Sequence, residues 1–427
     1  MRDSFVFTMR GNLTFIIISV LIFILLDLYV FQGVKILTHG FLPTARKIIH
    51  GLYWSVTVFS LTGYMMFHLG NPDKWSTLWR TFILSFILVN YFSKIFVALF
   101  LLIDDIKRLI EWIVEKVSAI FGREPVASEG KPISRSEFLV KTGFLVAAVP
   151  FISMGYGIIA GAYDYRVRRV KINLKNLPAS FDGLTIGQIS DIHSGSFYNK
   201  TAVKGGVEML LREKPDMIFF TGDLVNNIAS EVNEYIDVFS KVKAPLGVYS
   251  VMGNHDYGEY VKWPSAAARQ ANINDVIKAH KVMGWDILMN ENRILERNGE
   301  KIAILGIENW GTGRWPKYGK IDQAYRGTEE IPVKLLLSHD PSQWDGQVRP
   351  GYKDIDVMFA GHTHGFQFGV EIGNIKWSPS QYFYKQWAGL YKEGEQHLYV
   401  NRGFGFLGFP GRVGMPPEIT IFELKRA

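Results

Sequence analysis

The chain has 427 residues and no cysteine, so it can contain neither a disulfide nor a thiolate metal site. Hydrophobic residues make up 48% of it and its mean hydropathy is +0.08, values that are high for one soluble domain. The formal charge of +7 could suit nucleic acid, but no base-reading motif accompanies it, so we expect no nucleic-acid partner.

Four apolar runs occur near the N-terminus, and each is long enough to cross a hydrocarbon layer, which takes about 20 helical residues. They cover residues 13–31, 48–67, 81–103 and 138–160. We interpret them as four membrane helices and expect a multi-pass protein of the cell membrane, in contact with the lipid bilayer. The second run is the weakest, and its alternative interpretation is a buried helix of a soluble bundle, because it is diluted by Ser55, Thr57, Ser60 and Thr62.

Residues 104–122 have an amphipathic pattern that follows the third run. One helical face carries Ile106, Leu109, Ile110, Ile113, Val114 and Val117. Such a segment either lies in the plane of the membrane interface or extends the third helix and packs on its neighbours. Residues 122–132 then read as a short polar linker.

Lysine and arginine cluster beside the apolar runs, where anionic lipid head groups are the expected partners. The count of these charges favours loops 32–47 and 104–137 inside and the C-terminal domain outside, although the run Arg166–Lys171 argues against this topology. The segment Ser134–Leu139 resembles a twin-arginine export signal in which one arginine has become serine. We therefore expect an extracytoplasmic C-terminal domain.

The composition becomes that of a globular α/β domain at residue 166, so we predict a helical membrane region over 1–165 and a globular domain over 166–427. Eight apolar runs indicate strands, at residues 184–190, 217–221, 246–252, 302–307, 334–338, 355–360, 397–401 and 418–424. Segments of helical character separate several of them, at residues 201–213, 229–242 and 265–283. This alternation predicts stacked β-sheets flanked by helices, with chemistry at the strand ends.

Five short polar motifs follow these predicted strands. They are Asp191-Ile192-His193, Gly222-Asp223, Gly253-Asn254-His255-Asp256, Ser338-His339 and Gly361-His362-Thr363-His364. Taken alone, several have simpler interpretations, such as a turn, a helix cap or a hydrogen-bonded histidine at a strand end. Five in order, each after a strand-like run, indicate metal ligands instead.

The donors in these motifs are oxygen and imidazole nitrogen, and Asp223 is suited to bridge two cations. Two neighbouring cations can lower the pKa of a bridging water, hold phosphate oxygens and offset charge as the hydroxide attacks phosphorus. The sequence therefore predicts phosphoester chemistry with two divalent metal ions. Mixed His, Asp and Asn ligation fits Mn, Fe or Zn better than Ca or Mg.

The order and residue content of these motifs resemble the calcineurin-like metallophosphoesterases over nearly all of residues 180–425. The segments Tyr399–Gly405 and Arg412–Ile421 are similar to a membrane-associated bacterial branch of that family. The resemblance implies a sandwich of two stacked mixed sheets flanked by helices, with one metal held by Asp191, His193, Asp223 and His364. It implies a second metal held by Asp223, Asn254, His339 and His362. It also makes His255 the acid beside the site, oriented by Asp256.

Two positions depart from the family pattern without removing a ligand. Asn226 stands where an aspartate often follows Gly-Asp, and Phe366 occupies a position after the Gly-His-X-His motif that is often glycine. The pocket shape and the hydrogen bonds around the ligands therefore cannot be carried over from relatives. Aromatic and basic residues also cluster at 309–318 and 377–391, where they either meet acyl chains near the metals or pack within the fold.

We expect a membrane-anchored hydrolase of a phosphodiester or pyrophosphate, with His255 as general acid for the leaving oxygen. A lipid-linked substrate fits the membrane helices: a nucleotide-diacylglucosamine, an undecaprenyl-type pyrophosphate and a glycerophospholipid are all compatible. Two alternatives remain, namely the same chemistry on a soluble substrate and a non-catalytic membrane receptor or scaffold. The sequence predicts no oligomeric state.

Overall fold

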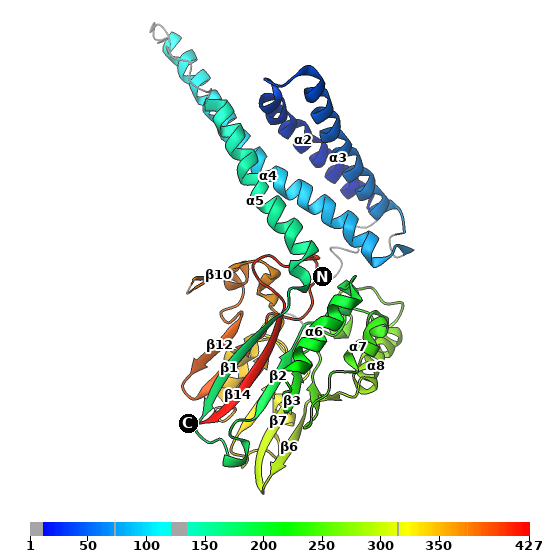
Figure 1. Cartoon of the computed structure of the whole chain (residues 1–427), viewed down its shortest axis with the longest axis vertical. Helices are drawn as coiled ribbons and strands as arrows, with labels where there is room; N and C mark the ends of the chain where they lie inside the picture. The colour runs from blue at the N-terminus through cyan, green and yellow to red at the C-terminus, as the bar shows by residue number, and fades with distance from the viewer. Residues whose placement is uncertain (1–11, 72–73, 121–134, 314–315, 374) are drawn as a thin grey trace. The chain divides into compact units, whose positions relative to one another are not determined.

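Two compact units divide the chain in the computed structural model, which describes residues 12–71, 74–120, 135–313, 316–373 and 375–427. The helical unit is Phe5–Tyr156, and the sheet unit, built from Gly157–Ala427, contains every strand of the described residues (Figure 1). The predicted linker at 122–132 and Ser134 of the segment that resembles an export signal lie outside the described residues.

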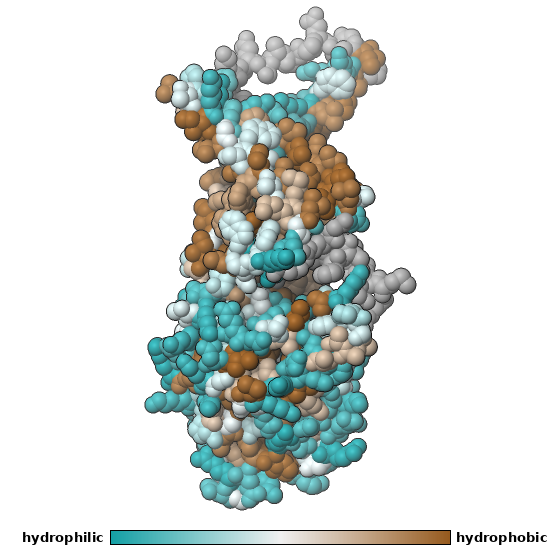
Figure 2. Space-filling view, turned by 90° about the vertical axis from the view of Figure 1, so that its right-hand side faces the viewer, coloured by the Kyte–Doolittle hydropathy of each residue, from teal (hydrophilic) through white to brown (hydrophobic). Residues whose placement is uncertain are grey.

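Four long helices dominate the N-terminal part: α2 (Leu13–Thr38), α3 (Pro43–Leu69), α4 (Thr77–Ile120) and α5 (Arg135–Ile159). Of the described helices, three are long and apolar enough to cross a membrane, over Leu13–Thr38, Thr77–Ser118 and Glu137–Ile159. Hydrophobic side chains are exposed along the helical unit, where Figure 2 shows them in brown. An exposed apolar surface of this kind is expected of helices that lie in lipid.

The second apolar run forms α3, which is not among those three helices. Its Ser60 Oγ accepts a hydrogen bond from the side chain of Asn90 on α4 at 3.1 Å. A Cβ at Gly63 would lie 2.9 Å from the side chain of Ile83, so the two helices approach closely there. Ser60 and Gly63, two of the residues that weaken the hydropathy of this run, are thus used at helix contacts, as is common between membrane helices, whereas Ser55 and Thr62 are exposed.

Residues 104–120 continue α4 without a break, so the predicted amphipathic segment is the second half of a 44-residue helix. Ile106, Leu109, Ile110 and Ile113 are between 45% and 55% exposed. Residues 104–120 therefore extend the third helix, as one of the two interpretations expected. The four side chains do not pack on neighbouring helices, because each remains about half exposed.

A buried ion pair joins α2 to α4. Asp27 is fully buried and pairs with Lys94. Tyr91 Oη donates to Asp27 Oδ2 at 3.0 Å, and Tyr53 Oη donates to the Asp27 carbonyl at 2.7 Å. Charged groups among apolar helices are costly unless they are paired and hydrogen-bonded, and both conditions are met here.

Two six-stranded mixed sheets stack in the sheet unit. The first has, in spatial order, β1 (Arg166–Leu174), β14 (Glu418–Arg426), β2 (Thr185–Ile189), β3 (Met217–Phe220), β4 (Val248–Ser250) and β5 (Asp286–Ile287). The second has β12 (Gly389–Glu393), β13 (Gln396–Val400), β9 (Val357–Ala360), β8 (Lys334–Leu337), β7 (Glu300–Gly306) and β6 (Glu291–Arg297). Within them, β2, β3 and β4 run parallel, as do β7, β8 and β9.

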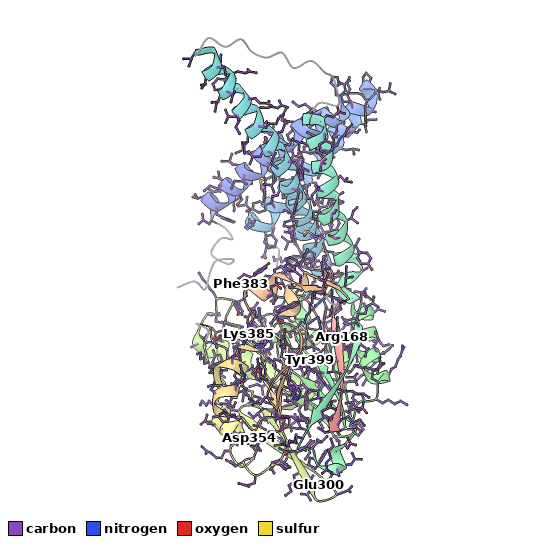
Figure 3. The ribbon with its side chains drawn as sticks, turned by 90° about the vertical axis from the view of Figure 1, so that its left-hand side faces the viewer. Arg168, Glu300, Asp354, Phe383, Lys385 and Tyr399 are labelled. Atoms are coloured by element: carbon purple, nitrogen blue, oxygen red, sulfur yellow. The ribbon has the colours of Figure 1, made fainter. Side chains whose placement is uncertain are left out.

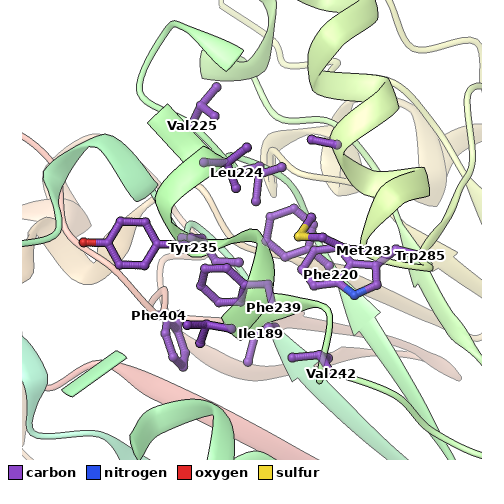
Figure 4. Close-up of a cluster of buried hydrophobic side chains, with 14 of the residues drawn as sticks. Ile189, Phe220, Leu224, Val225, Tyr235, Phe239, Val242, Met283, Trp285 and Phe404 are labelled. Atoms are coloured by element: carbon purple, nitrogen blue, oxygen red, sulfur yellow. The ribbon is translucent and has the colours of Figure 1, made fainter. Parts of the chain in front are cut away.

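Hydrophobic side chains fill the space between the sheets, and further hydrophobic clusters cover the outer face of each sheet. Phe219 and Phe359 meet between the sheets, with ring centroids 5.0 Å apart. On the outer face of the first sheet, a cluster that includes Phe220, Phe239 and Trp285 packs under α6 (Lys200–Arg212), α7 (Ile236–Phe239) and α8 (Ala266–Val282) (Figure 4). The short α9 (Ile321–Tyr325) and α10 (Arg349–Gly351) accompany the second sheet. The predicted fold class, stacked mixed sheets flanked by helices, is confirmed.

Each of the eight predicted strand runs overlaps a strand of the structure. The sequence does not predict β1, because its four basic residues interrupt any apolar run. β1 lies at the edge of its sheet, where charged side chains are common because they discourage pairing with another chain. Four of the basic residues that suggested lipid head groups are therefore part of an edge strand.

The sheet unit begins inside α5, whose last turn is bonded to two loops. The carbonyl of Gly157 accepts a hydrogen bond from the backbone N–H of Arg412 at 3.0 Å. The carbonyl of Ile158 accepts one from Tyr198 Oη at 2.6 Å. The end of this apolar helix is thus a fixed part of the sheet unit.

Candidate metal centre

Five loops at the carboxyl ends of parallel strands bring the predicted site residues together. They supply Asp191 and His193 after β2, Asp223 after β3, Asn254, His255 and Asp256 after β4, His339 after β8, and His362 and His364 after β9. Because the first three strands belong to one sheet and the last two to the other, the residues converge from both sheets. This edge of a parallel sheet is the usual place for a site.

Asp191, His193 and His364 form the first cluster, and all three are buried. His364 Nε2 lies 3.0 Å from His193 Nε2 and 3.3 Å from Asp191 Oδ1. The ligand atoms of the three side chains all lie within 4.8 Å of one another, which is close enough for one ion to contact all of them. The cluster therefore has the geometry of a cation site.

Asp223, His339 and His362 form the second cluster, joined by the amide oxygen of Asn254. His339 Nε2 lies 3.1 Å from Asp223 Oδ2, from Asn254 Oδ1 and from His362 Nδ1. The other ring nitrogen of His339 lies 2.8 Å from the Thr221 carbonyl. A neutral ring that donates from Nδ1 leaves its Nε2 lone pair free for a metal.

Asp223 lies between the two clusters. Its Oδ2 is 3.1 Å from His339 Nε2 and 3.5 Å from His193 Nε2, so it faces one histidine of each cluster. Its Oδ1 accepts a hydrogen bond from the backbone N–H of His255 at 2.9 Å. This is the position that a carboxylate shared by two ions requires.

Five of the candidate ligands have a left-handed backbone. The φ angles are 51° at Asp191, 47° at His193, 60° at Asp223, 72° at His362 and 52° at His364. Residues other than glycine are uncommon in this region, and such conformations concentrate at functional sites, where the surrounding structure imposes them. The strand-end loops thus turn sharply to aim these side chains inward.

The glycines of two motifs give the carboxylates room. A Cβ at Gly253 would lie 2.2 Å from Asp223 Oδ1, and one at Gly361 would lie 2.2 Å from Asp191 Oδ2. Any side chain at either position would displace a candidate ligand. Glycine is required here for space, independently of its backbone freedom.

His255 borders the first cluster, but Asp256 does not orient it. The His255 ring stands edge-on to His193, with centroids 4.9 Å apart, and its Nδ1 lies 2.7 Å from the carbonyl of Asn226. The fully buried carboxylate of Asp256 instead accepts hydrogen bonds from the backbone N–H groups of Asp223, Leu224, Val225 and Gly253. The predicted role of Asp256 is therefore wrong, because this carboxylate fixes the two loops that carry Asp223 and Asn254.

Three further residues contact the candidate ligands. Tyr384 Oη lies 2.7 Å from His362 Nε2, and Asp340 Oδ2 lies 3.7 Å from the same nitrogen. Asn254 Nδ2 donates to Tyr260 Oη at 2.7 Å. The position of Asp340 directly after His339 was a usable signal in the sequence, and Tyr384 belongs to the aromatic cluster at 377–391, whereas Tyr260 lies outside any motif or cluster.

Arg412 links the ligand loop to α5. It is buried, its Nη2 lies 3.4 Å from His364 Nδ1, and its guanidinium donates to the carbonyls of Arg402 (2.8 Å) and Gly403 (3.1 Å). Burial lowers the pKa of Arg412 to about 10, so the side chain remains positively charged at neutral pH.

Burial and mutual charge shift the pKa values of the site. Burial lowers the pKa of His193 well below its ordinary value and also lowers that of His255. For Asp223, burial opposes ionisation, but the imidazoles around it hold its pKa well below the usual range. For His339, burial lowers the pKa, but the neighbouring carboxylate of Asp223 has the larger opposite effect and raises the pKa to about 10. The buried donors fit two divalent cations, whose charge would replace the proton on His339.

Comparison with known proteins identifies two matching regions. The family model described as calcineurin-like phosphoesterase matches residues 184–366, and the one described as a probable calcineurin-like phosphoesterase, transmembrane domain, matches residues 9–162. A transmembrane protein with metallophosphoesterase domain from Danio rerio is 30% identical over 317 residues, covering 70% of this chain and 68% of that protein.

Two bacterial relatives are similar over almost their whole length. The uncharacterized metallophosphoesterase YkuE of Bacillus subtilis is 29% identical over 302 residues, covering 69% of this chain and 99% of its own. The phosphodiesterase YaeI of Escherichia coli is 24% identical over 293 residues, covering 68% of this chain and 99% of its own.

Proposed function

Because the chain belongs to the calcineurin-like metallophosphoesterase family and carries a membrane region, we propose that it hydrolyses a lipid-linked phosphodiester or pyrophosphate. The observation that carries this proposal is the pair of ligand clusters that meet at Asp223, with His255 beside them. Both clusters combine carboxylate and imidazole donors, which suit Mn, Fe or Zn.

We assign two divalent ions to these clusters. The first would be held by Asp191, His193, Asp223 and His364, and the second by Asp223, Asn254, His339 and His362. When bound, such ions polarise a phosphate and lower the pKa of a water molecule between them. Asp223 would fix the separation of the two ions, because it faces one histidine of each cluster.

His255 is our candidate for the acid that assists the leaving oxygen. Its Nδ1 is fixed by the Asn226 carbonyl, so Nε2 is the nitrogen that can reach a substrate, and the side chain is only half-buried. Because the neutral ring has its proton on Nδ1, the acid is the imidazolium form, which burial disfavours by lowering the pKa of His255. An alkoxide leaves poorly without a proton or a strong hydrogen bond, and general acid help is typically worth about 10²- to 10⁴-fold.

The membrane region and one relative support the proposed substrate class. Three long apolar helices tie the sheet unit to a bilayer, where lipid-linked phosphoesters are concentrated. The name of YaeI, a phosphodiesterase, supports a diester over a monoester. The ester could instead be soluble, with the helices acting only as a tether; a direct comparison of the two substrate types decides between these.

The full-length protein, purified and loaded with Mn, Fe or Zn, tests the proposal. A panel of monoesters, diesters and lipid pyrophosphates should show turnover, with a clear preference for lipid-linked diesters or pyrophosphates. Asn254→Ala and His255→Ala should each abolish most of it. Absence of hydrolysis with every metal, or full activity of both variants, would overturn the assignment.

We also propose that the sheet unit lies outside the cytoplasm, on the basis of the lysine and arginine count of the loops. A reporter fused after Ala427 tests this directly. An enzyme that works only after export should be active there, and activity of a reporter restricted to the cytoplasm would reverse the topology.

A further inference from the structure

A small hairpin near the candidate metal centre turns its apolar face outward. In the pair β10 (Val370–Ile372) and β11 (Ile375–Trp377), the register places Ile372 opposite Ile375 and Val370 opposite Trp377. Because side chains alternate along a strand, these four lie on one face. Ile372 is 71% exposed and Ile375 is 68% exposed.

The polar face of the same hairpin contacts the protein. Glu371 accepts two hydrogen bonds from Arg168, at 2.6 and 3.3 Å, and lies 3.2 Å from Arg402 Nη2. Opposite it, Lys376 donates to the Ala388 carbonyl and lies over the ring of Trp387. A hairpin on a water-exposed surface would normally show the reverse pattern, with its apolar face inward.

Exposed aromatic side chains extend this surface. Phe366 and Phe383 stack, with centroids 5.3 Å apart, and Phe383 is 71% exposed. Phe366 presents its ring from a left-handed backbone with a φ of 55°, where an aromatic residue is unusual. Trp377 Nε1 lies 3.3 Å from the hydroxyl of Tyr382, which is also exposed. We call Phe366, Ile372, Ile375, Trp377, Tyr382 and Phe383 the apolar platform.

The apolar platform lies beside the candidate ligands. Phe366 is two residues after His364, and Phe383 directly precedes Tyr384, whose hydroxyl lies 2.7 Å from His362 Nε2. A ligand that rested its apolar part on the platform would have its polar part within reach of the clusters.

The apolar platform also lies next to the end of α5. Gln367 donates to the carbonyl of Gly411 at 3.0 Å, and the next residue, Arg412, donates to Gly157 of α5 at 3.0 Å. Gly369 N, at the start of the hairpin, donates to the Val413 carbonyl at 2.9 Å. Phe383 lies at the end of the sheet unit that faces away from Glu300 (Figure 3). The same end of this unit therefore carries both an apolar helix that ends there and an exposed apolar surface.

We propose that the apolar platform inserts into the surface of the bilayer that α5 crosses, and that the acyl part of the substrate reaches the metal centre along it. The route of the acyl part rests on the proposed function, whereas insertion of the platform into the bilayer does not. A bilayer is favoured over a protein partner because the platform is continuous, through residues 411–413, with the end of a membrane helix. Aromatic and aliphatic residues together are typical of surfaces that enter the interfacial region.

Site-specific labelling tests insertion without any need for catalysis. The chain has no cysteine, so Ile372→Cys in the full-length protein takes a single environment-sensitive fluorophore. In phosphatidylethanolamine–phosphatidylglycerol vesicles that contain a nitroxide-labelled phosphatidylcholine, the label should be quenched. The matched control is Ile294→Cys, an exposed isoleucine of the edge strand β6, and Figure 1 shows the β6 label at the opposite end of the sheet unit from β10. Equal quenching of the label at both positions would overturn the proposal. It would also be overturned if the label at residue 372 stayed in an apolar environment in detergent, to a degree that rises with protein concentration, because a second copy of the chain would then cover the platform.

Kinetics test the route of the substrate. The double variant Ile372→Ser/Ile375→Ser should raise KM for a lipid-linked diester by roughly tenfold or more, because two apolar contacts are lost. Its kcat/KM for bis(p-nitrophenyl) phosphate should equal that of the wild type. An unchanged KM for the lipid substrate would refute the route, whereas a wild type inactive on both substrates would refute the proposed function and leave the quenching result standing.

Discussion

The carboxylate of Asp256 accepts a hydrogen bond from the backbone N–H of Asp223 at 3.0 Å, so one buried acid fixes the position of another. It accepts three more from neighbouring backbone groups of the two loops that hold Asp223 and Asn254. We predict that Asp256→Asn lowers the thermal midpoint and the metal content together, because an amide has one acceptor oxygen and leaves buried N–H groups unpaired, at about 1–3 kcal/mol each.

Thermal unfolding and elemental analysis of the full-length variant check this prediction. Asp182→Asn is the control, since this carboxylate bonds an exposed backbone N–H at the far end of the chain. A variant that keeps its metal and its stability, and loses only activity, would return Asp256 to the role of orienting His255.

Metal stoichiometry should separate the two clusters. His364→Ala removes a donor that only the first cluster uses, so we expect the content to fall from two ions per chain to one. Asp223→Ala should lose both, because its carboxylate faces both clusters. Elemental analysis after gel filtration measures this, with the exposed His39→Ala as control. Equal losses in the two site variants would contradict a bridging Asp223.

The leaving group should decide how much His255 matters. If it protonates the leaving oxygen, His255→Ala should slow cleavage of an alkyl diester by about 10²- to 10⁴-fold. A p-nitrophenyl ester, whose leaving group needs little help, should be slowed far less. Steady-state rates on the two esters, at matched metal content, provide the measurement. Identical losses would mean that His255 acts on binding or on metal geometry.

The pKa of His280 predicts acid sensitivity of the sheet unit. This histidine is fully buried on α8, Nδ1 lies 2.9 Å from Ser250 Oγ, and burial lowers its pKa to about 3. As the pH falls, the unfolded chain therefore takes up the proton first, near pH 6.5. From there down to about pH 3, the free energy of unfolding decreases by about 1.4 kcal/mol per pH unit.

The comparison of His280→Gln with the wild type isolates this effect. Between pH 7.5 and pH 5 the thermal midpoint of the wild type should fall further than that of the variant, since all other acid-sensitive groups are shared. Parallel pH profiles would show that His280 does not control the acid response.

The buried pair Asp27–Lys94 gives a prediction for the helical unit. Removal of one partner leaves an uncompensated charge among apolar helices, so Asp27→Leu should destabilise the helices by about 3–5 kcal/mol. The double variant Asp27→Leu/Lys94→Leu should recover most of that loss. Unfolding of the full-length protein in mixed detergent measures both. A double variant as unstable as the single one would indicate a function of the pair beyond packing.

Much of the fold and site could be predicted because each motif follows a short, mostly apolar run of strand character. The runs at 217–221 and 334–338 are buried on both faces, so hydrophobicity alone marks them, and polar residues directly after them can only lie at the sheet edge. The assignment of the ligands to two ions came from the family resemblance and stays a proposal, while the described side chains gather into two groups, each of which could hold one ion.

The remaining features depend on contacts that no local pattern encodes. The role of Asp256 depends on backbone groups more than 30 residues away, and Tyr384 reaches His362 from a loop without a motif. The hairpin at 370–377 is too short to show periodicity, and its outward apolar face is visible only once Glu371 is seen to contact Arg168. Phe366, noted as a departure from the family pattern, turned out to be part of that exposed surface.

Arg412 joins the end of α5 to the ligand loop, since its backbone N–H holds Gly157 while its guanidinium lies 3.4 Å from His364. The last turn of α5 is therefore structural material of the sheet unit, because its Gly157 and Ile158 carbonyls are bonded to Arg412 and Tyr198. A soluble version of this unit should begin before Gly157, since a cut after Ile158 would leave both donors, and with them the loop beside His364, without their acceptors.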